Sequence, residues 1–267
     1  MSFFLLFTIF FSFFNFTTLS FQFPGFLNDL VKSQKQLLAM KILYTFQIPF
    51  TTIAFFNVVL LSFGKQSAWF WGAVGYLFFG LSAIPFGYGS IAMGSLFFVV
   101  WIEIFGSFWW SAKQFKYPQE EMVISKLKIS YCVLLFLLFA LLFALFYEMV
   151  PYFTYYVLGN KYGYIIDKNI GITSWTHAWA IQLPRFIDAF CGAGNVICAI
   201  ATTFILRMNW ILWIIVNVLQ AILFCEINGQ GINWNLFILN IIYVFYSLYS
   251  IYIWYCNNNF CIKKYLF

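Results

Sequence analysis

Long apolar stretches recur along the whole chain, and they constrain its fold more than any other feature. Eight or nine such stretches have lengths of roughly 18 to 24 residues, and a helix needs about 20 residues to cross a ~30 Å hydrocarbon core. Hydrophobic residues fill 64% of the 267 positions and charged residues only 8%, whereas a soluble domain is about one quarter charged. We therefore predict a polytopic integral membrane protein.

The apolar stretches favour helices over strands. Phe, Leu and Ile run continuously through them with no period of two, whereas a membrane β-strand alternates over about 10 residues. The net charge is +6, but Lys and Arg stand singly between the apolar segments. Because a basic surface that binds nucleic acid requires clustered charge, we expect no nucleic-acid partner. The prediction is an all-α protein whose surroundings are the lipid bilayer.

Residue types that support catalysis or metal binding are scarce. The chain has one histidine, His177, and no CxxC pair among its six cysteines. A histidine-based metal site or a Ser/His/Asp triad therefore has few parts available. No predicted span carries paired carboxylates at helical spacing. We expect no enzymatic activity, no cofactor and no metal.

The chain divides into an N-terminal segment, a membrane domain and a tail. Residues 1–40 combine an apolar stretch, which lacks the pattern of a signal peptide, with an amphipathic helix. Residues 41–255 form the predicted transmembrane domain, and residues 256–267 form a C-terminal tail. The predicted spans of this domain are 42–63, 67–86, 91–110, 129–150, 186–206, 209–224 and 234–255.

Two longer connectors, 111–128 and 151–185, divide these spans into three, one and three. Both connectors are predicted to be solvated. We expect Arg185 and Asp188, at the mouth of the next span, to form an interfacial anchor or a mutual pair.

The two groups of three spans resemble each other. The same offset of 142 residues relates Lys65 to Arg207 and Trp71 to Trp213, which indicates an internal repeat. One linker helix, 129–150, places the repeats 42–110 and 186–255 parallel to each other. Parallel repeats are typical of transporters that bind substrate near the membrane midplane, between the repeats.

A polar stripe marks the sixth span. Trp210, Trp213, Asn217 and Gln220 follow one another at spacings of three, four and three, so that most of them share one helical face. Polar groups in lipid must face protein or water. The stripe therefore indicates either a hydrogen bond to another helix, with the tryptophans at the interface, or the lining of a site.

The pattern of a basic turn, W-x-x-W-x-x-x-N and a later Tyr-rich span that ends in Trp resembles the nicotinamide riboside transporter (PnuC) family. The matching residues are Arg207, Trp210, Trp213, Asn217, Tyr243, Tyr246 and Trp254. The first half is similar in GKQSAWFWGAVGY at 64–76 and in Gly106-x-x-x-Trp110. The resemblance covers residues 42–255 and is strongest from Asp188 onward.

This resemblance implies a homotrimer of seven-helix subunits in the cell membrane. It also implies passive uptake of nicotinamide riboside for NAD biosynthesis, followed by trapping through cytoplasmic phosphorylation. Aromatic and amide side chains suit a cationic ring joined to a sugar. The candidate substrate-binding residues are Trp71, Glu103, Trp110, Asn209, Trp213, Asn217, Tyr246 and Trp254.

Two positions depart from the family pattern. Glu103 stands in the third span, near a point where the family often has an uncharged amide, and a charge there costs about 2.5 kcal/mol or more. Glu103 either faces the positive ring, or titrates with transport, or is a protonated acid bonded to another helix. Gly75 stands where the second repeat has Asn217, a position at which the family pattern suggests a polar side chain.

Another class of protein has the same composition. A hydrophobic accessory subunit of a larger membrane assembly, such as a respiratory complex in an organellar inner membrane, would need no substrate cavity. Its tryptophan faces would pack against partner chains. A membrane-embedded enzyme is a third class, which the single histidine and the lack of paired carboxylates disfavour.

Overall fold

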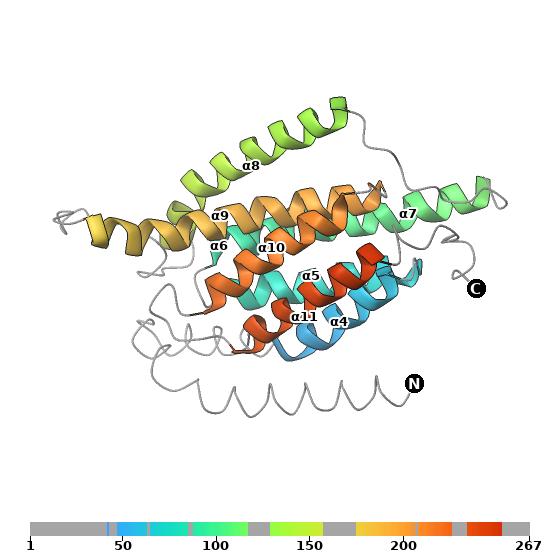
Figure 1. Ribbon diagram of the computed structural model, residues 1–267, viewed down its shortest axis with the longest axis horizontal. Coiled ribbons are helices and arrows are strands. Elements are labelled where there is room, and N and C mark those ends of the chain that lie inside the picture. Colours follow the sequence, from blue (N-terminus) through green and yellow to red (C-terminus); the bar gives the residue numbers. More distant parts are fainter. Residues whose placement is uncertain are drawn as a thin grey trace.

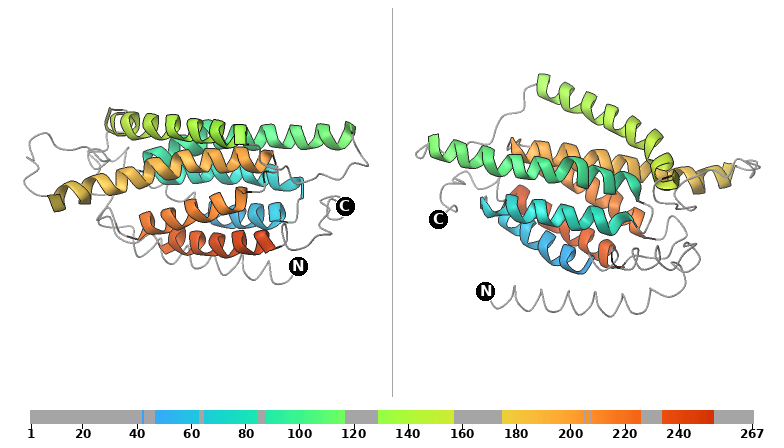
Figure 2. Two further views of the ribbon diagram at one scale, coloured as in Figure 1. Left: turned by 45° about the horizontal axis from the view of Figure 1, so that its top comes forward. Right: turned by 180° about the vertical axis from the view of Figure 1, so that it is seen from behind.

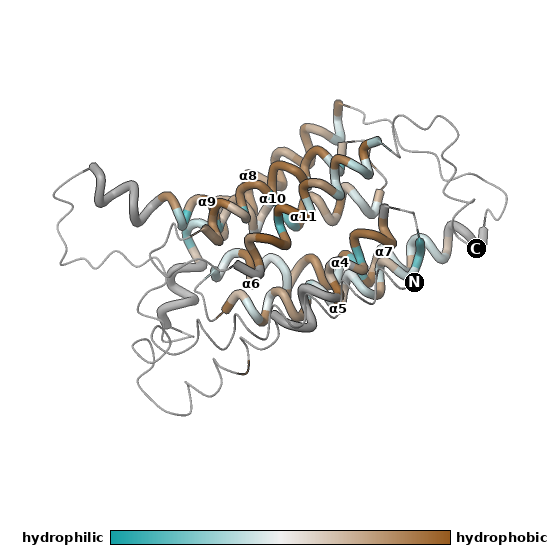
Figure 3. The backbone as a smooth tube through the Cα atoms, turned by 60° about the horizontal axis from the view of Figure 1, so that its bottom comes forward, coloured by the Kyte–Doolittle hydropathy of each residue, from teal (hydrophilic) through white to brown (hydrophobic). Residues whose placement is uncertain are grey.

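All the elements that the structure describes are helices (Figure 1), as the apolar spans predict. The computed structural model describes residues 42, 47–62, 65–84, 88–116, 129–156, 175–204, 206, 208–225 and 234–252. The predicted N-terminal segment, residues 1–40, and the tail, residues 256–267, lie outside these residues. Hydrophilic positions are few along the described spans (Figure 3).

Seven helical spans make up the described part of the chain. They are α4 (Gln47–Ser62), α5 (Ser67–Ala83), a third span made of α6 (Gly89–Gly94), η2 (Ser95–Val99) and α7 (Val100–Lys116), α8 (Ile129–Tyr156), α9 (Trp175–Thr203), α10 (Asn209–Phe224) and α11 (Trp234–Ile251). Three spans precede α8 and three follow it, which is consistent with the predicted three-one-three order. We call these two groups the first and second triplets.

The membrane-spanning character of these helices follows from length and composition. Gly89–Ala112, Ile129–Met149 and Leu183–Thr203 are each long and apolar enough to cross a bilayer, and Asn209–Phe224 and Leu236–Ile251 are shorter apolar helices. Backbone groups inside lipid must bond within their own segment, and a helix achieves this.

Helix α8 lies at the edge of the bundle and α9 at its centre (Figures 1 and 2). Only 11% of the apolar window of α8 is buried inside the protein, against 83% for α9. The inner side of α8, with Leu142 and Phe146, packs into a core cluster with Val99 and Ala193. The remainder of α8 is apolar and exposed, so its natural surroundings are lipid.

The two triplets meet in a backbone contact between α6 and α9. A Cβ atom at Gly192 would lie 2.5 Å from the carbonyl oxygen of Ser90, and one at Gly94 would lie 2.8 Å from the carbonyl oxygen of Gly192. Only glycine permits so close an approach of two helices.

Asp188 strengthens this contact from the side of α9. Its carboxylate accepts hydrogen bonds from the backbone N–H groups of Ser90, at 2.9 Å, and Ile91, at 3.2 Å. These groups begin α6 and have no partner within the helix. The predicted mutual pair of Arg185 and Asp188 is therefore wrong, because Asp188 binds the start of α6.

The predicted connector 151–185 is partly helical, because two prolines do not end their helices. α8 continues past Pro151 to Tyr156, and α9 begins at Trp175 and contains Pro184. Pro151 has no N–H to offer the carbonyl of Tyr147, four residues earlier. Arg185 supplies the missing donors: its Nε donates to this oxygen at 2.8 Å, and its Nη2 donates as well. A neighbouring helix thus satisfies the freed carbonyl.

The third span changes its register in the middle. Its residues Ser95–Val99 form a turn of π-helix between α6 and α7. Such a turn inserts extra residues into the helix and is frequent at functional sites. It re-aims the side chains that follow, so the face on which Glu103 lies does not follow from the periodicity of α6.

Candidate functional site

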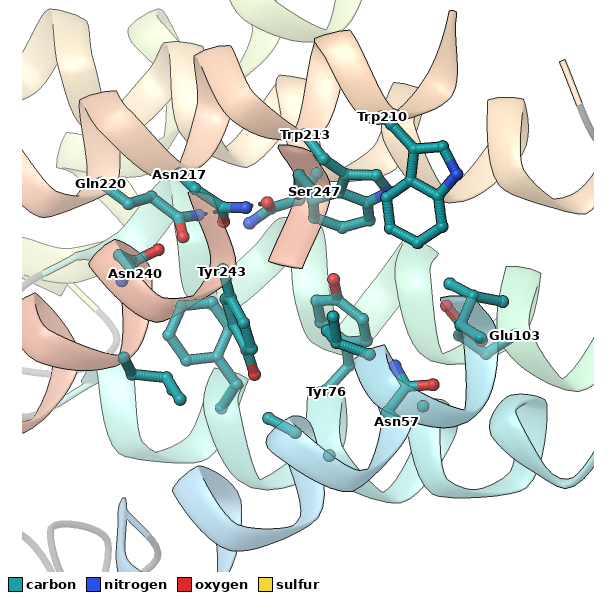
Figure 4. Close-up of a pocket in the computed structure, with 18 residues that line it drawn as sticks. Asn57, Tyr76, Glu103, Trp210, Trp213, Asn217, Gln220, Asn240, Tyr243 and Ser247 are labelled. Carbon is teal, nitrogen blue, oxygen red and sulfur yellow. Dashed lines mark hydrogen bonds between the residues drawn. The ribbon is translucent and has the colours of Figure 1, made fainter. Parts of the chain in front are cut away.

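A cavity of about 40 Å³ lies between the two triplets, lined by residues of α4, α5, α7, α9, α10 and α11 (Figure 4). It is much smaller than common ligand pockets, which measure about 300–1,000 Å³. Space of this size suits water molecules. A ligand that needs a pocket of that common size could bind here only if the lining helices moved apart.

Both triplets contribute polar side chains to the cavity. They are Asn57, Tyr76 and Glu103 from the first triplet, and Asn195, Asn217, Gln220, Asn240, Tyr243 and Ser247 from the second. Polar groups inside membrane spans are costly, and they mark substrate pathways or helix contacts. Their convergence on one cavity makes this the candidate site.

The polar stripe of α10 faces the cavity. Trp210, Trp213, Asn217 and Gln220 all line it. Gln220 bonds another helix, since its Nε2 donates to Oδ1 of Asn195 at 3.1 Å. The stripe thus combines the two predicted roles, lining a cavity and joining helices.

Thr202 on α9 orients the aromatic part of this stripe. Its hydroxyl oxygen accepts hydrogen bonds from Nε1 of Trp213, at 3.1 Å, and from Nδ2 of Asn209, at 3.2 Å. The same hydroxyl donates to the carbonyl of Cys198 at 2.8 Å. All its bonding capacity is used. Trp213 is also stacked on Tyr76, with ring centroids 6.3 Å apart and planes at 29°.

The opposite side of the cavity carries a carboxyl group without a bonded partner. Glu103 is only 3% exposed, and within the described residues it forms no hydrogen bond and no ion pair. A Cβ atom at Gly72 would lie 2.5 Å from Oε2 of Glu103 and 3.1 Å from Nδ2 of Asn57. Gly72 therefore makes room for both side chains, which lie side by side in Figure 4.

The residues that line the cavity include no Lys, Arg or His in the described part of the chain. Arg185, the one described arginine, is engaged elsewhere: it lies over the ring of Tyr147, 4.0 Å from the centroid, and 3.7 Å from Glu148. In the cavity, Oδ1 of Asn57, Nδ2 of Asn195 and Oδ1 of Asn240 are buried without a hydrogen-bond partner. The cavity thus offers one acidic group and several unused polar atoms.

Of the eight predicted substrate-binding residues, the cavity brings together Glu103, Trp213 and Asn217. Asn209 is fully buried and contacts Thr202 instead of the cavity. The other predicted residues take different positions.

Trp71 is 37% exposed, beside Phe56 and Phe70, and does not line the cavity. Trp110 is fully buried, where its Nε1 donates to the carbonyl of Thr203 at 3.2 Å. Tyr246 is half-buried on α11 and is not part of the lining. Trp254 lies outside the described residues.

Several lining residues were not predicted from the sequence. Asn57, Asn240 and Ser247 are isolated polar residues in apolar spans, and that isolation is a signal that could have identified them. Tyr76 carries no such signal, because many aromatic residues in these spans face lipid.

Comparisons with known proteins bear on the family and the fold of this chain. A family model described as nicotinamide mononucleotide transporter matches residues 44–256. Among solved structures, the crystal structure of the vitamin B3 transporter PnuC matches with a TM-score of 0.55 and 15% identity, over 95% of this chain and 91% of that chain. A search of curated proteins gives no match. Identity this low shows a shared fold, whereas the family model spans most of the chain. The chain therefore belongs to the nicotinamide mononucleotide transporter family, whose members are membrane transporters and not enzymes.

Proposed function

We propose that this protein carries nicotinamide riboside, or a related pyridine nucleoside, across the cell membrane by facilitated diffusion. The observation that carries the proposal is the chemistry of the cavity: a carboxyl group on one side, amides on the other and an aromatic pair between them. A homotrimeric assembly, which the sequence resemblance implies, belongs to the same proposal.

The charge of the lining favours a nucleoside over its phosphorylated form. The pyridinium ring of nicotinamide riboside is a cation, and Glu103 is the only acidic side chain among the described residues that line the cavity. A mononucleotide would bring a phosphate into a cavity in which no described residue is basic. Desolvating an unpaired anion is strongly unfavourable, and a second negative charge nearby adds repulsion.

The remaining groups match the neutral parts of such a ligand. The faces of Trp213 and Tyr76 suit a cationic aromatic ring, a contact of about 0.5 to 2 kcal/mol when water is excluded. Asn195 has an unused N–H donor and Asn240 an unused acceptor. Ribose hydroxyls and a carboxamide offer the complementary groups, and pairing a buried polar atom removes a penalty of about 1–3 kcal/mol.

The closed cavity fits transport by alternating access. A site enclosed between two triplets opens to one side or the other only if the triplets move relative to each other. The backbone contact of Gly94 and Gly192 is the place where they are most closely joined. We expect opening to occur away from this backbone contact, where α11 of the second triplet lies against α4 of the first.

The test is uptake of labelled nicotinamide riboside into proteoliposomes that contain the purified protein. We expect saturable uptake that unlabelled riboside inhibits and the mononucleotide does not. Asn217→Ala should lower uptake by about tenfold, since one polar contact in a dry site is worth about 1.4 kcal/mol. Val218→Ala is the matched control, because the adjacent Val218 is exposed and does not line the cavity. Failure of well-folded protein to take up any pyridine nucleoside would contradict the proposal.

A further inference from the structure

Glu103 occupies an unusual electrostatic position. It is buried at the side of the cavity, and the lining residues in the described part of the chain offer no cation to balance a carboxylate. Water can occupy only a small volume beside it, because the whole cavity measures about 40 Å³. A carboxylate ion in such a place costs several kcal/mol.

Two species are able to remove this cost, a proton and a cationic ligand. When the cavity holds no cation, the neutral acid is the favoured form, because a carboxyl group buried without a counter-ion takes up a proton. The neighbouring Asn57 supports the neutral form, since its buried Oδ1 lacks a donor and only a protonated carboxyl group can donate a hydrogen bond. When a cation enters, it neutralises the carboxylate in the proton's place.

The groups around Glu103 leave it as the site of this exchange. Tyr76 on α5 interacts electrostatically with Glu103, and the hydroxyl of Tyr243 on α11 and the thiol of Cys198 on α9 lie near Tyr76 in turn. Each of these groups is neutral when protonated and cannot serve as a counter-ion. From α4 and α10, the lining residues Asn57, Trp210 and Trp213 face the cavity and do not titrate.

Two other charged groups on α9, Asp188 and Arg185, have partners of their own. Asp188 binds the start of α6. Arg185 binds the carbonyl of Tyr147 and lies beside Glu148.

We propose that the protein exchanges a cationic substrate for a proton, with Glu103 as the single group for which the two compete. The O–H bond of Glu103 breaks as the cation enters, and the proton leaves to water on the side of entry. After the cation has left on the other side, water there returns a proton to Glu103. One positive charge thus accompanies the carboxylate in each direction.

This inference rests on the proposed function and adds a counter-ion to it. Each cycle moves one cation inward and one proton outward, so no net charge crosses the membrane. When the pH is equal on both sides, the exchange behaves as facilitated diffusion. Uptake without proton exchange would instead carry one net charge, worth about 2.3 kcal/mol per 100 mV, and would follow the membrane potential.

The experiment separates these two cases in one set of proteoliposomes with labelled nicotinamide riboside. An inside-acidic gradient of about one pH unit should concentrate the substrate about tenfold, because the two gradients balance at equilibrium. An inside-negative potential, set with potassium and valinomycin at equal pH, should concentrate it by less than about twofold. Accumulation that follows the potential and ignores the pH gradient would overturn the inference and leave the proposed function standing. Absence of uptake under every gradient would overturn the proposed function itself.

Two glutamate variants locate the exchange. Glu103→Gln keeps the size of the side chain and removes the proton, so accumulation driven by pH should be lost. Glu148→Gln is the matched control, because this carboxylate is 70% exposed and lies outside the cavity, and it should retain the full response to pH. If Glu103→Gln does not fold, the comparison of the pH gradient with the membrane potential in the wild-type protein still tests whether the substrate is exchanged for a proton. A Glu103→Gln protein that still accumulates substrate in response to pH would overturn the role of Glu103.

Discussion

The two faces of the cavity differ in how their polar groups are held. We call Trp213, Asn217 and Gln220 the amide face, and Glu103, Asn57 and Gly72 the carboxyl face. On the amide face, Thr202 anchors Trp213 and Asn195 anchors Gln220. On the carboxyl face, Glu103 has no described hydrogen bond, and Oδ1 of Asn57 is unpaired.

This difference shows that the two triplets contribute different chemistry to the cavity. Side chains fixed by hydrogen bonds lose little entropy when a ligand binds, so the amide face is prepared for recognition. The carboxyl face keeps a group whose charge state is free to change. Gly75 and Asn217 show the same asymmetry. The offset of 142 residues relates these two positions, and both residues line the cavity, but only Asn217 has a polar side chain.

The largest effect is expected from the aromatic ring of the amide face. Trp213→Ala removes the surface available for a cationic ring, a loss of up to about 2 kcal/mol, or roughly 30-fold in the apparent KM for uptake. Trp71→Ala is the matched variant in the first repeat, and because Trp71 lies off the cavity we expect a change below about twofold. Equal increases of KM in both variants would show that Trp71 and Trp213 contribute equally to substrate binding.

A smaller effect is expected from the residue that orients this ring. Thr202→Val keeps the shape of the side chain and removes the acceptor for Trp213 and Asn209, which should raise KM about fivefold, for a bond worth about 1 kcal/mol. Thr202→Ser should restore the wild-type KM. In Thr203→Val, only a bond to the carbonyl of Ala199 is lost, so KM should not change. A Thr202→Val protein with unchanged KM would show that Trp213 needs no anchor.

The amide pair of Gln220 and Asn195 provides a measure of how firmly this face is held. Gln220→Leu and Asn195→Leu, alone and combined, form a double-mutant cycle read out by thermal unfolding in detergent. We expect a coupling energy of about 0.6 kcal/mol, the mean for hydrogen bonds between membrane helices. Coupling near zero would mean that the amide face is as loosely held as the carboxyl face.

The smallest effect is expected at Gly75. A Cβ atom there would meet Ile53 at 3.4 Å, which is ordinary contact, whereas one at Gly72 would lie 2.5 Å from Glu103. Gly75→Ala should therefore leave the unfolding temperature and uptake nearly unchanged. Gly72→Ala should displace the carboxyl group and slow uptake, with a modest effect on stability because the end of a flexible side chain can move. Equal behaviour of the two variants would show that the position of Glu103 does not matter.

Much of the fold was predictable because each span is decided locally. The predicted span 209–224 coincides with α10, whereas α8 and α9 are longer than predicted because Pro151 and Pro184 lie inside them. The sequence shows each proline, but it does not show that Arg185, on another helix, donates a hydrogen bond to the carbonyl of Tyr147. Helix ends in lipid depend on such partners.

The site was predictable only in part. The polar stripe of α10 identified Trp213 and Asn217, since polar residues in an apolar span must face protein. Trp71, Trp110 and Tyr246 have the same residue types, yet they lie away from the cavity. An aromatic residue suits lipid, a helix contact and a ligand equally well, so its type does not reveal its position.

The sequence by itself determined that this protein is a helical membrane protein, where most of its spans run and to which family its motifs point. The physical reason is that bilayer thickness and backbone hydrogen bonding act on each segment separately. Only the tertiary structure decided that Glu103, Asn57 and the amide face surround one cavity, and that Thr202 anchors Trp213. Those relations depend on the register of helices that are distant in the sequence, and on a π-helical turn that re-aims α7.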